Sequence, residues 1–208
     1  DYAYYWLKGG GDTHSYSFPV AHAIYQYCQI TGNYQLLKEL YPELLQNYSE
    51  WKKEKFIAEK GLFWQKDGED GMEVSIGGHG FRATINSYMA AEAATLSKIA
   101  HWKNDNQAQA LEAEAWRIKE NMFKYLWDPK AEFLKVLSVE KNASLEDVRE
   151  LHGYTPWAFD LASADYAVAW KFLMNTRHFL APYGPTTAEQ CHPQFKVAYE
   201  GHECQWNG

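Results

Sequence analysis

The fold is indicated most clearly by residues 82–125, which read RATINSYMAAEAATLSKIAHWKNDNQAQALEAEAWRIKENMFKY. Apolar side chains recur at intervals of three and four residues on both sides of a polar Asn104-Asp105-Asn106 turn. This spacing predicts one helix over residues 82–102 and another from Ala108 to Tyr125, packed as an antiparallel hairpin. The apolar stripes are Ile85, Tyr88, Met89, Leu96 and Ile99 on one side of the first helix, and Ala108, Leu111, Ala115, Ile118, Met122 and Tyr125 on the second.

Upstream of this stretch the sequence predicts another helical hairpin. Ser17 before Phe18-Pro19 has the pattern of a helix start with Ser17 as the cap, and Gly32-Asn33 has the pattern of its end. A second apolar stripe then predicts a further helix, with Pro42 near its first turn or at a bend. The stripe consists of Leu37, Leu40, Leu44, Tyr48 and Trp51.

Downstream, residues 132–139 favour a short strand and the apolar spacing from Ser163 to Leu173 predicts one more helix. Residues 181–208 are rich in Pro, Gly, His and aromatic residues without periodicity, which is typical of a functional loop. Strands and helices do not alternate as a parallel sheet would require. The fold class is therefore predicted to be all-α, built of antiparallel helix hairpins with a short β excursion, in a single domain over residues 1–208.

The composition indicates a soluble protein with an acidic surface. The net charge is -7, and the basic residues are dispersed among a larger number of acidic ones, which disfavours nucleic-acid binding. No apolar stretch approaches the ~20 residues that cross a bilayer, so we expect no membrane partner. Periplasmic or secreted locations both agree with this composition, and the oligomeric state is left open.

Aromatic residues make up 16% of the chain, with 9 Trp, 15 Tyr and 10 Phe, which exceeds the usual needs of packing. Sugars stack their C–H faces on aromatic rings and hydrogen-bond to polar side chains, so an aromatic-rich acidic cleft suits a carbohydrate. An aromatic-rich core is the structural alternative.

The main candidate site is residues 64–80, WQKDGEDGMEVSIGGHG, a glycine-punctuated loop with clustered carboxylates and a histidine. Glycines allow tight turns and close ligand approach. Neighbouring carboxylates shift each other's pKa values and can supply both an acid and a base, which is the chemistry of glycosidic bond cleavage. The alternative interpretation is an acidic surface loop ordered by Arg82 or by a metal ion.

Several motifs resemble the six-hairpin glycosidases, whose (α/α)6 barrel is a toroid of helix pairs. The similarity is strongest to bacterial enzymes such as mannosylglycerate hydrolase and processing α-glucosidase, and it spans nearly the whole chain. The motifs are Thr13-His14-Ser15-Tyr16, Asp70-Gly71-Met72-Glu73-Val74-Ser75, Phe81-Arg82-Ala83-Thr84-Ile85-Asn86-Ser87-Tyr88, Leu151-His152-Gly153-Tyr154-Thr155-Pro156-Trp157, Ala181-Pro182-Tyr183-Gly184-Pro185-Thr186-Thr187 and Gln205-Trp206-Asn207-Gly208.

The resemblance implies an inverting glycoside hydrolase with Glu73 at the position of the general acid and Asp70 as the competing candidate. A salt bridge to Arg82 is the structural alternative for Glu73. The general base of such enzymes follows a Trp-Asn-Gly-Pro or Trp-Arg-Gly-Pro motif, so it is expected beyond Gly208 or at Glu203, with Glu200 and Glu189 as further candidates. Fewer helix pairs than a whole barrel are predicted, so the chain is expected to cover part of one.

Inversion requires the two carboxyl groups to stand ~6.5 to 9.5 Å apart, which leaves room for water. Aromatic stacking and hydroxyl contacts to a carbohydrate substrate are assigned to side chains of the glycine-punctuated loop and of these motifs. For the tryptophans, packing in the core is the alternative. The predicted substrate-binding residues are Trp64, Gln65, His79, Arg82, Asn86, His152, Trp157 and Trp206.

Two other functions remain compatible with the sequence. A sugar isomerase or epimerase on a similar barrel would use loop histidines as proton carriers, because imidazole titrates near neutral pH. A carbohydrate-binding module would bind sugar without turnover. The loop histidines are His14, His79, His152, His192 and His202.

No cofactor or metal is expected from the sequence. Cys28, Cys191 and Cys204 are widely spaced and match no zinc pattern. Asp67, Glu69 and Asp70 offer oxygen ligands suited to calcium, but they lack the complete ligand-loop pattern.

Overall fold

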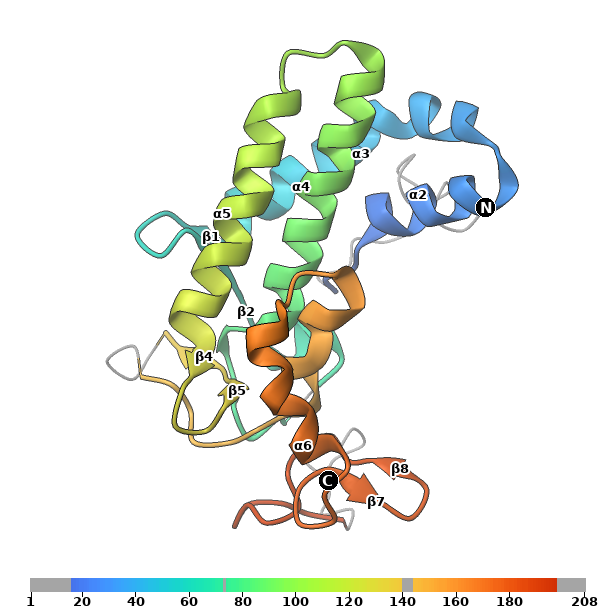
Figure 1. Ribbon diagram of the computed structural model, residues 1–208. Helices are drawn as coiled ribbons and strands as arrows, with labels where there is room; N and C mark the ends of the chain where they lie inside the picture. The colour runs from blue at the N-terminus through green and yellow to red at the C-terminus, as the bar shows by residue number, and fades with distance from the viewer. Residues whose placement is uncertain (1–15, 73, 140–143, 198–208) are drawn as a thin grey trace.

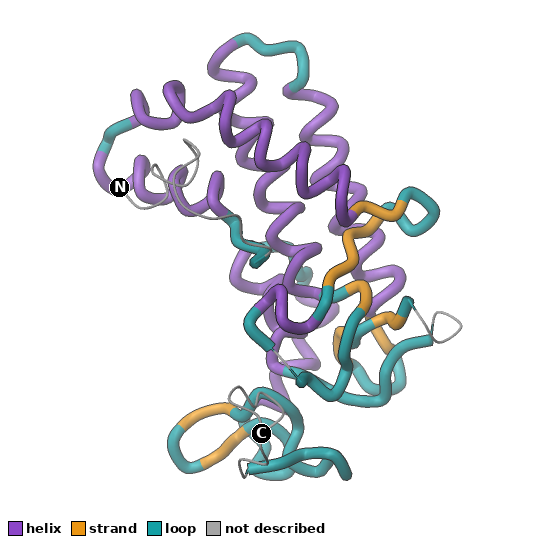
Figure 2. Tube along the Cα trace, turned by 180° about the vertical axis from the view of Figure 1, so that it is seen from behind, coloured by secondary structure: helices purple, strands orange, loops and turns teal. Residues whose placement is uncertain are grey.

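Two helical hairpins form the upper part of the molecule, and the short strands and most loops gather toward its other end (Figures 1 and 2). The computed structural model describes residues 16–72, 74–139 and 144–197. The first hairpin consists of α2 (Val20–Thr31) and α3 (Tyr34–Lys55), and the second of α4 (Ala83–Lys103) and α5 (Ala108–Leu126). Both predicted hairpins are therefore confirmed. Within the described ranges, no helix is long and apolar enough to cross a bilayer.

The turns of both hairpins use residues in the left-handed conformation. Gly32 follows α2 with φ +75° and donates its N–H to the Cys28 carbonyl at 2.8 Å, while Asn104 follows α4 with φ +53°. Glycine and asparagine adopt this conformation at little cost and end helices for that reason. Pro42 lies inside α3 and not in its first turn, so the first of its two predicted places is wrong and a bend at Pro42 stays a prediction.

Helix α4 lies at the centre of the fold and is buried on most of its surface, not along one side as predicted. It packs against α2, α3, α5 and strand β2 (Leu62–Gln65). Its small side chains, such as Ala90 and Ala93, allow neighbours to approach from several directions. Helix α5 instead follows the predicted pattern, with Leu111, Ile118 and Met122 buried and Trp116 exposed on the far side.

The predicted cap of α2 is wrong. The helix begins at Val20, and the Ser17 hydroxyl donates to the Glu69 carbonyl instead of accepting an N–H of the first helical turn. A carboxylate of α4 binds a free N–H in the first turn of α2: Glu92 Oε1 accepts from the His22 N–H at 3.0 Å. An acceptor from a distant helix thus takes the role expected of a local side chain.

Glu92 makes the stability of the fold depend on pH. Burial raises its pKa from 4.5 to about 8, although the N–H groups of His22 and Ala21 oppose this shift. Between these two pH values the Glu92 side chain holds a proton in the folded state that it releases in the unfolded chain, so the contribution of Glu92 to stability falls as pH rises through this window. For one proton we expect a slope of about 1.4 kcal/mol per pH unit.

The measurement is urea unfolding of the wild type and Glu92→Gln between pH 5 and pH 8. Glutamine keeps the acceptor oxygen without the titrating group. The unfolding free energy of the variant minus that of the wild type should therefore increase steadily as pH rises. A difference that is constant across this range would contradict the assignment.

The strands are short and all pairs are antiparallel. Strands β1 (Phe56–Ile57), β2, β3 (Gly80–Phe81) and β6 (Leu137–Ser138) form one sheet in that order. Strand β4 (Trp127–Asp128) pairs with β5 (Phe133–Leu134), and β7 (Leu180–Ala181) pairs with β8 (Gly184–Pro185). The single strand predicted over residues 132–139 is therefore divided between two sheets. The helical class is confirmed, but the chain contains more strands than predicted, and the complete toroid stays a prediction.

A second apolar cluster supports the lower part of the fold. Phe133, Tyr154 and Phe179 pack together there beside the 3-10 helix η2 (Leu151–Phe159). The helix predicted from Ser163 begins as the 3-10 helix η3 (Ala164–Ala169) and continues as α6 (Trp170–Leu173). Helix η2 was missed because its Gly153 and Pro156 are residues that favour turns.

Candidate functional site

The loop that connects β2 to β3 carries the predicted site. It starts with the 3-10 helix η1 (Asp67–Asp70), in which Glu69 Oε2 accepts the backbone N–H of Lys66 at 2.9 Å. The other oxygen of Glu69 accepts from Lys55 Nζ at 2.6 Å, and this ammonium lies 4.9 Å from the ring centroid of Trp64. Glu69 therefore anchors the loop to α3.

Arg82, which precedes α4, binds the rest of the loop from the buried side. Its side chain is fully buried, and Nε donates to Asp70 Oδ2 at 2.9 Å. Nη1 donates to Ser75 Oγ at 3.1 Å and to the Gly78 carbonyl, while Nη2 lies 3.7 Å from Met72 Sδ. One guanidinium thus holds the loop at four places, two before and two after position 73. A fork of fixed donors is suited to such a role because its geometry is rigid.

The backbone beside position 73 is strained. Val74 has φ +62°, which is rare for a β-branched residue, and its side chain is 45% exposed. Met72 on the other side is buried. Such strain persists only where surrounding contacts impose it, and it concentrates at functional sites. Glu73 itself lies outside the described residues, as do Glu203 and Trp206.

The side chain of Asp70, at the end of η1, is buried against Arg82. Its side chain is 1% exposed, and one carboxylate oxygen is bound to Arg82. The other oxygen, Oδ1, is buried without a hydrogen-bond partner among the described residues. Arg82 therefore has Asp70 as its ionic partner, the arrangement that the structural alternative assigned to Glu73.

A second buried carboxylate, Glu150, supports the far end of the loop. Glu150 Oε1 accepts the Gly77 N–H at 3.2 Å, and Oε2 lies 3.2 Å from His152 Nε2. Burial alone would raise the pKa of Glu150, but the hydrogen bond and charge of His152, together with the charge of Arg82, lower it. His152 Nδ1 is buried without a partner in the described part of the chain.

Sequence reasoning did not identify Glu150. Its position two residues before the predicted binding residue His152 was the available signal. A glutamate in this position is common on exposed surfaces, so the signal was weak.

The predicted hydroxyl-binding amides differ in their availability. Asn86 is fully engaged, since its Oδ1 accepts the Phe63 N–H at 2.9 Å and its Nδ2 donates to the carbonyls of Phe63 and Arg82. Gln65 is also buried, but neither atom of its amide has a partner among the residues described. Gln65 therefore retains polar atoms that a ligand or water could satisfy.

The remaining predicted contacts lie near the surface. His79 is partly exposed, and its Nδ1 accepts the Asp67 N–H at 3.2 Å. Trp64 and Trp157 are both half-buried. Trp157 lies edge-on to Trp170 at 5.4 Å between ring centroids, so part of its area serves packing.

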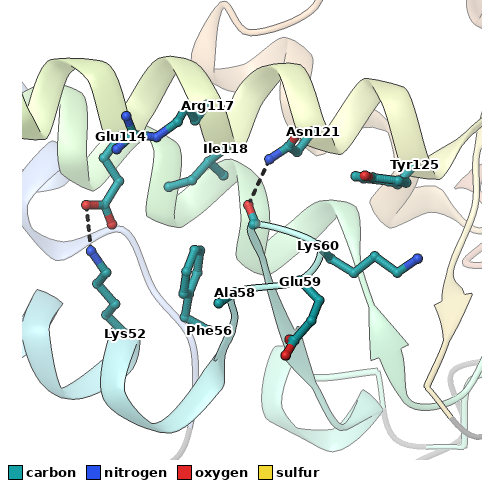
Figure 3. Close-up of a pocket in the computed structure, with 11 residues that line it drawn as sticks. Lys52, Phe56, Ala58, Glu59, Lys60, Glu114, Arg117, Ile118, Asn121 and Tyr125 are labelled. Carbon is teal, nitrogen blue, oxygen red and sulfur yellow. Dashed lines mark hydrogen bonds and ion pairs between the residues drawn. The ribbon is translucent and has the colours of Figure 1, made fainter.

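Two cavities of the described chain lie away from this loop. One has a volume of about 410 Å³ between α3, α5 and the β1–β2 turn, where Lys52 binds Glu114 at 2.7 Å (Figure 3). The other, of about 360 Å³, lies between α5 and η3 and includes Phe123 and Tyr166. Neither is lined by a predicted catalytic or substrate-binding residue.

The helical hairpins agree with the helical-barrel glycosidase fold, and solved structures share their arrangement. The GH63 mannosylglycerate hydrolase of Thermus thermophilus in complex with glucose superposes with a TM-score of 0.73 at 14% identity, over 95% of this chain and 59% of that chain. A sialidase superposes with a TM-score of 0.87 at 34% identity, over 93% of this chain and 18% of that chain.

The chain belongs to the family of mannosylglycerate hydrolase MGH1-like glycoside hydrolase domains, whose pattern it matches over residues 7–208. An uncharacterized protein of Borreliella burgdorferi is 26% identical over 190 residues, which are 89% of this chain and 39% of that protein. The chain thus spans less than half the length of this curated relative. The resemblance to six-hairpin glycosidases inferred from the motifs is confirmed.

Proposed function

We propose that this chain is the part of an inverting glycoside hydrolase that carries the general acid, with Glu73 as the acid. Residues 1–208 would then belong to a single (α/α) barrel domain or to a fragment of one. The observation that supports this most is the buried Arg82, which holds the loop on both sides of position 73. Rigid support of this kind keeps a catalytic group within reach of its substrate atom.

In this mechanism Glu73 protonates the leaving glycosidic oxygen while a second carboxylate activates water on the opposite face of the sugar. Glu203, or a residue beyond Gly208, is proposed as that base. Asp70 is proposed to position the loop, because its buried carboxylate is bound to Arg82. Glu150 supports the same loop through Gly77.

The proposed substrate is a carbohydrate. The unpartnered amide of Gln65 and the partly exposed rings of Trp64 and Trp157 are groups that bind sugar hydroxyls and sugar faces. His79, His152 and Trp206 are proposed to complete these contacts. Thermus thermophilus mannosylglycerate hydrolase has been solved with glucose and with D-glycerate, which supports a hydroxyl-rich ligand.

The test is an assay of the full-length protein against a panel of α- and β-linked glycosides, with the anomer of the first product followed by proton NMR. We expect hydrolysis with inverted configuration. Retained configuration would overturn the inverting assignment, and the absence of hydrolysis across the panel would overturn the function. Binding without turnover would identify a binding module, and an isomerised sugar would identify an isomerase.

A further inference from the structure

A cluster of metal-ligating side chains lies in the segments around β7 and β8, below α6 (Figure 1). It consists of His178, Glu189 and Cys191, whose ligand atoms all lie within 4.8 Å of one another. His178 comes before β7, and Glu189 and Cys191 follow β8. None of the three takes part in the contacts that hold the loop with Glu73.

The distances between the three ligand atoms match a tetrahedral metal site. Zinc binds nitrogen and carboxylate oxygen at about 2.0–2.2 Å and sulfur at about 2.3 Å, so the edges of its tetrahedron are about 3.3–3.7 Å long. Cys191 Sγ lies 3.6 Å from His178 Nδ1 and 3.7 Å from Glu189 Oε2. His178 Nδ1 and Glu189 Oε2 are 3.0 Å apart and would need to separate by only a few tenths of an ångström.

The two segments are held together by Gln190, which lies between two of the ligands. Its Nε2 donates to the carbonyls of Thr176, His178 and Leu180 at 3.2, 3.1 and 3.0 Å, and its backbone N–H donates to the His178 carbonyl at 2.9 Å. These bonds fix the separation of the ligands without a metal. The His178 ring also packs edge-on against Phe172, at 5.0 Å between centroids.

Arg149 orients the carboxylate of Glu189. Its Nη1 donates to Oε2 at 2.7 Å and its backbone N–H donates to Oε1 at 3.0 Å. Nε and Nη2 of Arg149 both donate to the Ala131 carbonyl, so the guanidinium is held in place. A carboxylate oxygen has two lone pairs, which leaves one of Oε2 for a cation. Supporting contacts of this kind are usual around metal ligands.

The protonation states of the anionic ligands have opposite tendencies. Burial would raise the pKa of Glu189, but hydrogen bonds from Arg149 and His178 lower it, so the carboxylate is ready to bind. Partial desolvation of the thiol and the nearby Glu189 carboxylate raise the pKa of Cys191, although the residue as a whole is exposed. Zinc binds cysteine as the thiolate, so a metal that binds here displaces the thiol proton.

We propose that His178 Nδ1, Glu189 Oε2 and Cys191 Sγ form a three-ligand site for Zn²⁺ or a similar borderline-soft divalent cation. Nitrogen, sulfur and one carboxylate oxygen are a donor set that favours zinc over calcium or magnesium. The fourth position of the tetrahedron is open to water or to a further ligand. The site is separate from the proposed sugar-cleaving loop and would link the segments around β7 and β8.

The test is titration of the full-length, metal-free protein with Co²⁺ and then Zn²⁺, followed by absorption spectroscopy and calorimetry. We expect an intense thiolate-to-cobalt band that saturates at one Co²⁺ per chain and is abolished by Zn²⁺. Cys191→Ser should remove the band, and His178→Ala should weaken affinity at least about tenfold. His101→Ala, at an exposed position on α4, is the matched control and should bind as the wild type does.

Circular dichroism of Cys191→Ser should match that of the wild type, because the residue is exposed and the change is conservative. No cobalt band in the wild type, or a band that persists in Cys191→Ser, would overturn the proposal. Glycosidase activity is not part of the readout, so the outcome is independent of the proposed function.

Discussion

Replacing Glu73 by glutamine in the full-length protein is expected to reduce kcat by about 10²–10⁴-fold for glycosides with poor leaving groups, because the proton donor is lost. Glycosides with an activated leaving group, such as dinitrophenolate, need little protonation and should retain most of their rate. This dependence on the leaving group separates a general acid from a residue that only binds sugar. The measurement is kcat and KM for a matched pair of substrates.

Glu112→Gln is the control for this experiment, since Glu112 is exposed on α5, far along the chain from the loop. Its kinetics should equal those of the wild type. If Glu73→Gln leaves both substrates unaffected while Asp70→Asn shows the dependence on the leaving group, the acid is Asp70 and our assignment is wrong.

Replacing Arg82 by methionine is expected to lower the free energy of unfolding by about 3–5 kcal/mol, because it leaves a buried carboxylate without its partner. That carboxylate is Asp70, which is 1% exposed and whose Oδ2 accepts from Arg82 Nε. The loop that carries position 73 would lose four contacts at once. Activity should therefore fall together with stability, as measured by denaturant unfolding and by kcat/KM.

The double variant Arg82→Met with Asp70→Asn should recover part of the lost stability, since the uncompensated charge is removed. Arg117→Met serves as the control, because Arg117 is exposed on α5 and such changes stay within about 0.5 kcal/mol. Equal losses in Arg82→Met and Arg117→Met would show that the buried ion pair does not carry the stability of the loop.

The spacing of apolar residues predicted where the helices lie, but it predicted less well which faces of each helix are buried. The stripe of α5 agrees with its buried residues because one face of this helix meets the core. The similar pattern of α4 suggested one buried side, but the helix is surrounded. Hydrophobic periodicity detects contrast between faces, and small alanines give little contrast whether they are buried or exposed.

The candidate site shows the same limit at the level of single side chains. Arg82 and Asn86 were predicted to contact sugar hydroxyls, and both have the donors for it. In the folded chain, Asn86 joins Phe63 of β2 to the start of α4, and Arg82 holds the loop. A sequence shows which hydrogen bonds a side chain can make, but not which of the possible partners lies beside it in the folded chain.

The sequence alone determined the helical class, the two hairpins with the places of their turns, and the glycine-rich acidic loop, because these follow from residue types and spacing over a few helical turns. Only the tertiary structure decided which polar groups meet. The pairs Arg82–Asp70, Glu92–His22 and Gly77–Glu150 join residues 12, 70 and 73 positions apart. How deeply these groups are buried depends on how whole helices and strands pack. The same packing brings together the partners whose hydrogen bonds offset the cost of burying polar groups.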